Sequence, residues 1–321
     1  MVQHLQETVT GSPGLYAMRA PPARPPSRPP SVSAMLTGME STRPAREVRR
    51  SVARLRDGRW ACVEDAISAE EPMEIRLLWQ AGGELQRRSI AVTMRTPGDD
   101  FALAAGFLFG EDIIGGPDDV VDLSYCTDED EEQAFNIVTV TLRPGLAFDE
   151  TRLERNFFTT SSCGVCGKAT LDALEVHGCA AVPGGFAIAP AVISAMPGAL
   201  RAAQAGFAAT GGIHAAGLFD ANGTLLALKE DVGRHNALDK VIGEQVLAGC
   251  TDLHDRAVLL SGRASFELLQ KALVARVPVV CAVGAPSSLA VELAESFGIT
   301  LVGFVRPGGF NVYAGRQRIS G

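Results

Sequence analysis

The region between residues 256 and 309 constrains the fold most, because strand-like and helix-like segments alternate there. Strands are predicted at 256–260, 277–283 and 299–305, and helical segments end at residues 275 and 297. Each strand is followed by a short turn rich in glycine or serine. This order is typical of parallel strands joined by crossover helices, so we expect an α/β sheet.

The turns after these strands begin at Ser261, Gly284 and Arg306. In a parallel sheet such turns gather on one edge, which is where ligands bind. Turns that open helices offer free N–H groups to phosphate oxygens, and arginines supply donor pairs of matching geometry. The sequence therefore predicts an anion site of nucleotide type, with candidate residues Ser261, Gly262, Arg263 and Arg306.

Further elements flank this region. Segments 213–219 and 224–230 enclose Asn222-Gly223, which indicates a β-hairpin. Earlier in the chain, strands are expected at 73–78, 89–94 and 135–142. A helix is expected over 101–109, with Thr96 as its N-cap.

Composition divides the chain into three parts. Residues 1–47 are rich in proline and arginine and are predicted to be disordered, residues 48–150 to form a smaller α+β unit, and residues 151–321 to hold a thiol loop and the α/β domain. The net charge is −8, which argues against nucleic acid as a partner. No apolar run reaches membrane-span length or resembles a signal peptide, and the seven cysteines form no disulfide pattern. We expect a cytoplasmic protein that binds no membrane.

Two thiols stand in the segment Ser161-Ser162-Cys163-Gly164-Val165-Cys166-Gly167-Lys168, followed by a helix-like run. A helix N-terminus and an adjacent ammonium both favour thiolate, the reactive form of cysteine. Three functional interpretations stay open. The pair can cycle between dithiol and disulfide, can bind zinc together with His177 and Cys179, or can carry and release a persulfide sulfur.

The segment from Lys229 to Asn236 is dense in polar groups at a strand-to-helix junction. It is either a capped surface turn or a corner that orients a ligand, with Lys229 and Arg234 for an anion and His235 for proton transfer. His214 is followed by Ala215 and Ala216. Zinc deaminases have H-x-E followed by P-C-x-x-C, so the alanine and the reversed order of the motifs argue against deamination.

Together these segments resemble the FdhD family of sulfurtransferases, which are required for active formate dehydrogenase. The resemblance covers most of residues 70–315 and leaves residues 1–45 outside. The matching segments are Arg95–Asp100, Ser161–Lys168, Gly211–Ala216, Glu230–Ala237 with Asp239 and Lys240, Ser261–Arg263 and Gly303–Arg306.

The resemblance implies a three-layer fold similar to cytidine deaminases in the C-terminal domain, and a homodimer. It implies that a cysteine desulfurase gives sulfane sulfur to Cys163, assisted by Cys166. The sulfur then passes to the molybdenum (or tungsten) bis-guanine-dinucleotide cofactor, which is bound as a substrate before its insertion into formate dehydrogenase; no intrinsic metal is expected. The alternative is a cofactor chaperone whose thiols are a zinc or redox site. The residues expected to bind the cofactor are Phe304, Val305, Arg306, Pro307, Gly308 and Gly309, joined by Ser261, Gly262, Arg263, His214, Lys229, Arg234, His235 and Asn236.

Overall fold

A six-stranded sheet forms the centre of the C-terminal half in this computed structural model, which describes residues 44–126, 135–148 and 180–320. The strand order is β12-β11-β10-β9-β7-β8. The strands β9, β10 and β11 run parallel, whereas β7, β8 and β12 pair antiparallel to their neighbours. The predicted parallel α/β core and the predicted β7–β8 hairpin are both confirmed. The bounds are β7 His214–Phe219, β8 Leu225–Asp231, β9 Ala257–Leu260, β10 Val279–Ala282, β11 Thr300–Arg306 and β12 Gly309–Ala314.

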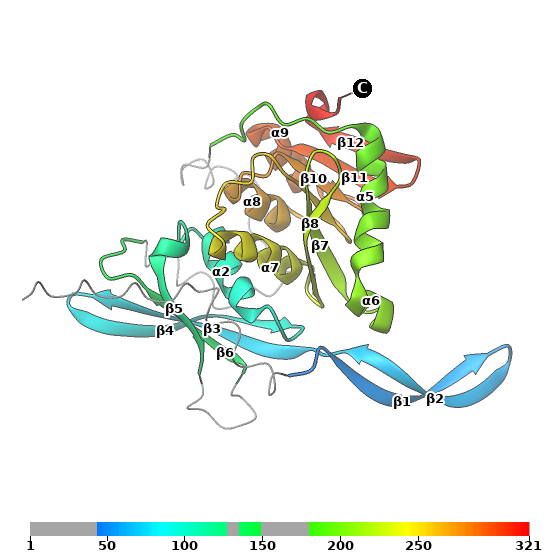
Figure 1. Ribbon diagram of the computed structural model, residues 1–321, viewed down its shortest axis with the longest axis horizontal. Coiled ribbons are helices and arrows are strands. Elements are labelled where there is room, and N and C mark those ends of the chain that lie inside the picture. Colours follow the sequence, from blue (N-terminus) through cyan, green and yellow to red (C-terminus); the bar gives the residue numbers. More distant parts are fainter. Residues whose placement is uncertain (1–43, 127–134, 149–179, 321) are drawn as a thin grey trace, which may run out of the picture. The chain divides into compact units, whose positions relative to one another are not determined.

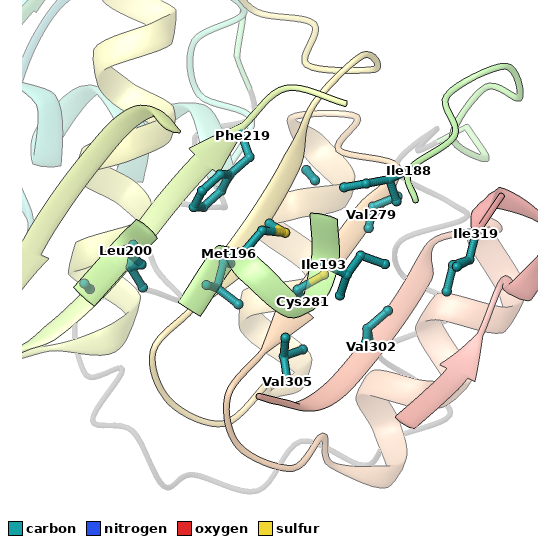
Figure 2. Close-up of a cluster of buried hydrophobic side chains, with 13 residues drawn as sticks. Ile188, Ile193, Met196, Leu200, Phe219, Val279, Cys281, Val302, Val305 and Ile319 are labelled. Carbon is teal, nitrogen blue, oxygen red and sulfur yellow. The ribbon is translucent and has the colours of Figure 1, made fainter. Parts of the chain in front are cut away.

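Helices cover both faces of this sheet (Figure 1), so the three predicted layers are present. One face packs against α5, whose Ile193, Met196 and Leu200 meet Val279, Cys281 and other strand residues in a closed apolar cluster (Figure 2). The other face packs against α7 and its neighbours. Because side chains alternate along a strand, each strand serves both faces. The bounds are α5 Pro190–Ala203, α6 Ala205–Thr210, α7 Arg234–Leu247, α8 Phe266–Val274, α9 Ser288–Phe297 and the 3-10 turn η3 Arg316–Arg318.

A second sheet of four strands, in the order β4-β3-β6-β5, is built from the N-terminal part of the described chain. The glycine turn at Gly82-Gly83 joins β3 to β4 with positive φ at both residues, as a tight hairpin requires. The strands expected at 73–78, 89–94 and 135–142 correspond to β3, β4 and β6. The bounds are β3 Glu71–Ala81, β4 Glu84–Arg95, β5 Val120–Tyr125, β6 Ile137–Leu142, helix α2 Asp100–Gly110 and the 3-10 turn η1 Pro117–Asp119.

The predicted N-cap of α2 is wrong. The helix begins at Asp100 and its cap is Asp99, which adopts a left-handed conformation with φ 56°. The hydroxyl of Thr96 instead accepts a hydrogen bond from the Val232 N–H at 3.1 Å, and the Thr96 N–H donates to Asp231. Thr96 therefore ties the two halves of the described chain together, a role that local sequence does not reveal.

Helices α2 and α7 cross with their backbones in direct contact at two glycines. A Cβ atom on Gly243 would lie 1.8 Å from the carbonyl oxygen of Ala102, and one on Gly106 would lie 1.9 Å from that of Asp239. Beside this crossing, the buried Lys240 ammonium contacts the Asp231 carboxylate at 2.7 Å and the Thr96 carbonyl at 2.8 Å. The described residues accordingly belong to one unit, Gly38–Gly321.

A two-stranded ribbon, β1 (Glu47–Arg56) with β2 (Arg59–Ser68), precedes the four-stranded sheet (Figure 1). The turn Asp57-Gly58 has positive φ at both positions, the signature of a two-residue hairpin. Sequence reasoning missed this ribbon, although the Asp-Gly pair is a recognised hairpin signal. Within the described ranges, no helix is both long and apolar enough to cross a membrane.

Candidate functional site

The carboxyl ends of the parallel strands and the start of α7 meet at one edge of the six-stranded sheet. The strand β7 runs opposite to β9, so its first residue, His214, lies at this edge, paired with Asp231 at the end of β8. The turn after Asp231 leads directly into α7 at Arg234. The three turns expected from the sequence lie here, and the structure brings His214 and Arg234, also expected in the site, to the same edge.

Main-chain hydrogen bonds hold the turns of this edge together. The Gly284 N–H donates to the Gly262 carbonyl at 2.9 Å, and the Phe304 N–H donates to the Gly284 carbonyl at 3.1 Å. Ser261 joins the row through β7, because its N–H donates to the Ala215 carbonyl and its hydroxyl accepts from the Ala215 N–H. A Cβ atom on Gly284 would lie 3.0 Å from the Gly262 carbonyl oxygen, so any side chain here would push the two turns apart by a few tenths of an ångström.

Phe304 presents an aromatic ring at this edge. It has a left-handed backbone with φ 55°, next to an irregularity in the pairing of β11 with β12, and it is 44% exposed. Left-handed backbone at a bulky residue is uncommon and clusters at functional sites. Val283, which sequence reasoning left out of the site, is 41% exposed beside Gly284. Val283 could have been identified as a site residue because it is an exposed apolar residue at the end of a buried strand.

His214 lies over Gly262, where a Cβ atom would be 3.4 Å from the imidazole Nδ1. Burial is the main cause that lowers the pKa of His214, and the charge of Arg234 lowers it further, whereas Asp231 acts in the opposite direction. The imidazole is therefore neutral at pH 7. The Nε of Arg234 is buried and has no hydrogen-bond partner among the described residues. A cation beside a neutral histidine is a suitable place for an anion.

His235 faces the N-terminus of α8. Its Nε2 lies 3.2 Å from the Ser265 hydroxyl and 3.6 Å from the Glu267 carboxylate. The interaction with His235 is the main cause that lowers the pKa of Glu267 to about 2. Because serine and carboxylate both approach the same ring nitrogen, this group lacks the two-sided arrangement of a nucleophilic triad.

Lys229 and Asn236 use their polar atoms within the protein. The Lys229 ammonium contacts Asp99 at 3.1 Å and Glu244 at 2.6 Å. Burial alone would lower the pKa of Lys229, but these carboxylates outweigh it and raise the pKa. The Asn236 amide donates to the Met94 carbonyl and to Asp231, and its oxygen accepts from Thr93. Lys229 thus links β8 to α7 and to the residue that precedes α2, and Asn236 links α7 to β4 and β8. The predicted ligand contacts of both residues stay predictions.

The remaining predicted residues differ in exposure. Val305 is buried in the apolar cluster, so only its backbone faces the edge (Figure 2). Arg263, Arg306, Pro307 and Gly308 are exposed, and Gly309 is half-buried. Neither Arg263 nor Arg306 forms an ion pair with another described residue, so both guanidinium groups are available to an anion.

The predicted reactive thiols, Cys163 and Cys166, lie outside the described residues, as do His177 and Cys179. Four other cysteines are described and all are free. Burial raises the pKa of the Cys281 thiol to about 12, so this thiol is inert, whereas Cys62 and Cys250 are exposed. Over the described ranges, no group of three or more His, Cys, Asp or Glu is arranged to hold a metal.

The fold and this edge define an α/β protein whose central sheet has a rim of glycine-rich turns, formed by residues 261–263, Gly284 and residues 304–309. A family model, FdhD/NarQ family, matches residues 69–320. The curated Sulfur carrier protein FdhD of Streptomyces avermitilis is 48% identical over 276 residues, covering 85% of this chain and 95% of the relative. The protein of that name from Mycobacterium tuberculosis is 47% identical over 263 residues, covering 80% of this chain and 92% of the relative. The chain belongs to the FdhD/NarQ family.

A solved structure supports the fold. The crystal structure of a protein from Desulfotalea psychrophila, named as a formate dehydrogenase accessory protein, is similar with a TM-score of 0.65. It covers 86% of this chain and 100% of its own, at 24% identity. The mixed α/β architecture predicted from sequence is therefore confirmed.

Proposed function

We propose that this protein is a sulfur carrier that serves formate dehydrogenase maturation. A cysteine desulfurase gives it a sulfane sulfur, which it holds as a persulfide on Cys163. It then transfers the sulfur to the molybdenum bis-guanine-dinucleotide cofactor, its bound substrate, before that cofactor enters formate dehydrogenase. The observation that carries the proposal is that one chain has both the C-x-x-C sequence and a rim suited to a nucleotide, and that its relatives are named sulfur carriers.

The rim provides groups that match the chemistry of a guanine dinucleotide. The exposed Phe304 ring offers a surface for stacking a base. Arg234, Arg263 and Arg306 offer guanidinium groups to the pyrophosphate. The neutral His214 accepts or donates one hydrogen bond without adding charge. The glycines of the rim allow the ligand to approach the backbone.

The transfer balances without an external oxidant. The Cys163 thiolate attacks the outer sulfur of the desulfurase persulfide, the S–S bond of that persulfide breaks, and the desulfurase cysteine leaves as thiolate. Cys166 then attacks the inner sulfur of the Cys163 persulfide, the S–S bond of that persulfide breaks, and the outer sulfur leaves as hydrosulfide. The cofactor takes up this hydrosulfide in exchange for an oxygen ligand, which leaves as hydroxide. The result is a Cys163–Cys166 disulfide, which a cellular thiol reductant must restore before the next turnover.

The first test incubates the reduced protein with a cysteine desulfurase and L-cysteine, followed by mass spectrometry of the intact chain and its peptides. We expect one added sulfur on the peptide that contains Cys163, and none in Cys163→Ala. The exposed cysteines provide matched controls, because Cys62→Ala and Cys250→Ala should accept sulfur like the unchanged protein.

An unmodified Cys163 peptide, despite free thiols and an active desulfurase, would contradict the carrier role. The metal content of the purified protein then distinguishes the alternative. Stoichiometric zinc that is lost in Cys163→Ser would identify a cofactor chaperone with a structural thiol site.

A second prediction concerns the rim itself. In Gly284→Ala the new methyl group lies 3.0 Å from the Gly262 carbonyl oxygen and 3.1 Å from the Arg263 N–H nitrogen, so the two turns must separate. We expect the affinity for guanosine diphosphate, measured by calorimetry, to fall by about ten-fold, with a stability loss of about 1 kcal/mol. Gly184→Ala is the control, because its methyl group meets no atom within 4 Å. Equal affinities of the two variants would place the nucleotide elsewhere.

A further inference from the structure

Asp231 is a fully buried carboxylate at the end of β8, on the edge of the sheet that carries the rim. Four hydrogen-bond donors surround its two oxygens. One oxygen contacts the Lys240 ammonium at 2.7 Å and accepts from the Thr96 N–H at 3.1 Å. The other oxygen accepts from the Gly233 N–H at 2.8 Å and from the Asn236 amide at 3.0 Å. Both oxygens therefore act as acceptors.

This set of donors has no place for an amide at position 231. A carboxylate accepts hydrogen bonds at both oxygens, whereas asparagine has an NH₂ group in place of one of them. In Asp231→Asn the NH₂ group must face either the Lys240 and Thr96 donors or the Gly233 and Asn236 donors. Donor then meets donor in both cases, so the hydrogen bonds on one side break.

The oxygen that faces α7 shapes the turn that leads to Arg234. The Gly233 N–H donates to the side chain two residues before it, which is the hydrogen bond of an Asx turn. Gly233 is the N-cap of α7, and Arg234 is the first residue of that helix. A Cβ atom on Gly233 would lie 2.9 Å from the Asn236 amide nitrogen and 3.3 Å from the Asp231 carboxylate, so the turn packs closely on both groups. The position of Arg234 thus depends on Asp231.

The charge of Asp231 also acts on His214, whose backbone pairs with that of Asp231 across the β7–β8 hairpin. Burial is the main cause that lowers the pKa of His214, and the charges of Arg234 and His235 lower it further. Of the three charges that act on this imidazole, Asp231 alone favours the protonated form. Removal of the carboxylate would leave the cations unopposed, which lowers the pKa of His214 again.

We propose that Asp231 is a positioning residue of the rim, which fixes the turn that presents Arg234 and sets the charge around His214. The inference rests on the proposed function, because it is there that both residues are assigned to the nucleotide. Asp231 itself does not touch the ligand, since it is fully buried and its oxygens are occupied. The bond to Thr96 means that the N-terminal half of the described chain contributes to the geometry of the rim.

The first test compares Asp231→Asn with Glu230→Gln as a matched control. Glu230 is the neighbouring buried carboxylate of β8, and it accepts from the N–H groups of Gly206 and Phe207 at 2.7 and 2.8 Å. We expect Asp231→Asn to raise the Kd for guanosine diphosphate, measured by calorimetry, by about ten-fold, and Glu230→Gln to leave it unchanged. Urea unfolding should show a loss of stability in both variants, so lost stability alone does not separate them.

The second readout follows His214 in the free protein. NMR spectra of protein with labelled histidine are recorded as a function of pH, and the His214 signal is identified by its absence from His214→Gln. We expect His214 to titrate at lower pH in Asp231→Asn than in the unchanged protein, and at an unchanged pH in Glu230→Gln. In folded Asp231→Asn, either an unchanged titration of His214 or an unchanged Kd for guanosine diphosphate would overturn the proposal.

Gly233→Ala tests the turn separately in case Asp231→Asn does not fold. This variant keeps the Lys240–Asp231 pair and adds one methyl group against the Asn236 amide. We expect the Kd for guanosine diphosphate to rise by about three-fold, and a Kd equal to that of the unchanged protein would contradict the role of the turn. If the unchanged protein binds no guanosine diphosphate, the proposed function loses its nucleotide, whereas the His214 titration still decides whether Asp231 sets the charge at the rim.

Discussion

Replacing Cys163 with alanine is expected to reduce formate dehydrogenase activation to the level seen without this protein. The reason is chemical, since alanine has no sulfur on which a persulfide can form. The measurement is the activity of formate dehydrogenase matured in cells that carry the variant in place of the unchanged gene. Cys166→Ala should weaken activation and leave part of it, because small thiols can replace the assisting cysteine.

Two controls distinguish loss of the carrier thiol from general damage. Cys281→Ala removes a thiol that is buried in the core and inert, so it should lower stability without removing activation. Cys163→Ala should also keep its affinity for guanosine diphosphate. Full activation by Cys163→Ala would show that sulfur does not travel through this residue.

Adding one methyl group at Gly243 is expected to lower the free energy of unfolding by about 3 kcal/mol, the upper end for overpacked sites. The new Cβ atom would lie 1.8 Å from the Ala102 carbonyl oxygen, so helices α2 and α7 must separate. Their separation also disturbs the Lys240–Asp231 pair and the Thr96 hydrogen bonds that join the two halves. Urea unfolding of Gly243→Ala should therefore show a clearly lower midpoint.

Gly198→Ala is the matched control, since Gly198 lies inside α5 and a methyl group there meets no atom within 4 Å. Alanine is the better helix former, so this variant should gain about 0.5–1 kcal/mol. A Gly243→Ala midpoint equal to or above that of the unchanged protein would show that the helices relax without cost.

The strands and turns that depend only on neighbouring residues in the sequence were predictable from local sequence patterns. The strands β9, β10 and β11, each followed by a glycine- or serine-rich turn, were predictable because apolar runs and turn residues act at short range. The Asn222-Gly223 hairpin was predictable for the same reason. The gathering of the turns at Ser261, Gly284 and Arg306 on one edge followed from the geometry of parallel strands.

Features that depend on distant partners were not predictable. Thr96 has the sequence context of a helix cap, but its hydroxyl is taken by Val232, which lies far along the chain. Lys229 and Asn236 have the chemistry of ligand-binding residues, yet their polar atoms meet Asp99, Glu244 and Met94. A single sequence does not show which polar atoms are already satisfied by long-range contacts.

The row of main-chain bonds from Gly262 through Gly284 to Phe304 has a consequence for how such a site changes over evolutionary time. Because carbonyl and N–H groups make these bonds, their formation does not depend on most of the side chains around them. Exposed positions such as Val283, Arg263 and Arg306 can therefore be exchanged by drift without dismantling the frame. Substitutions at these positions can therefore change what the rim contacts while the glycines beneath it stay fixed.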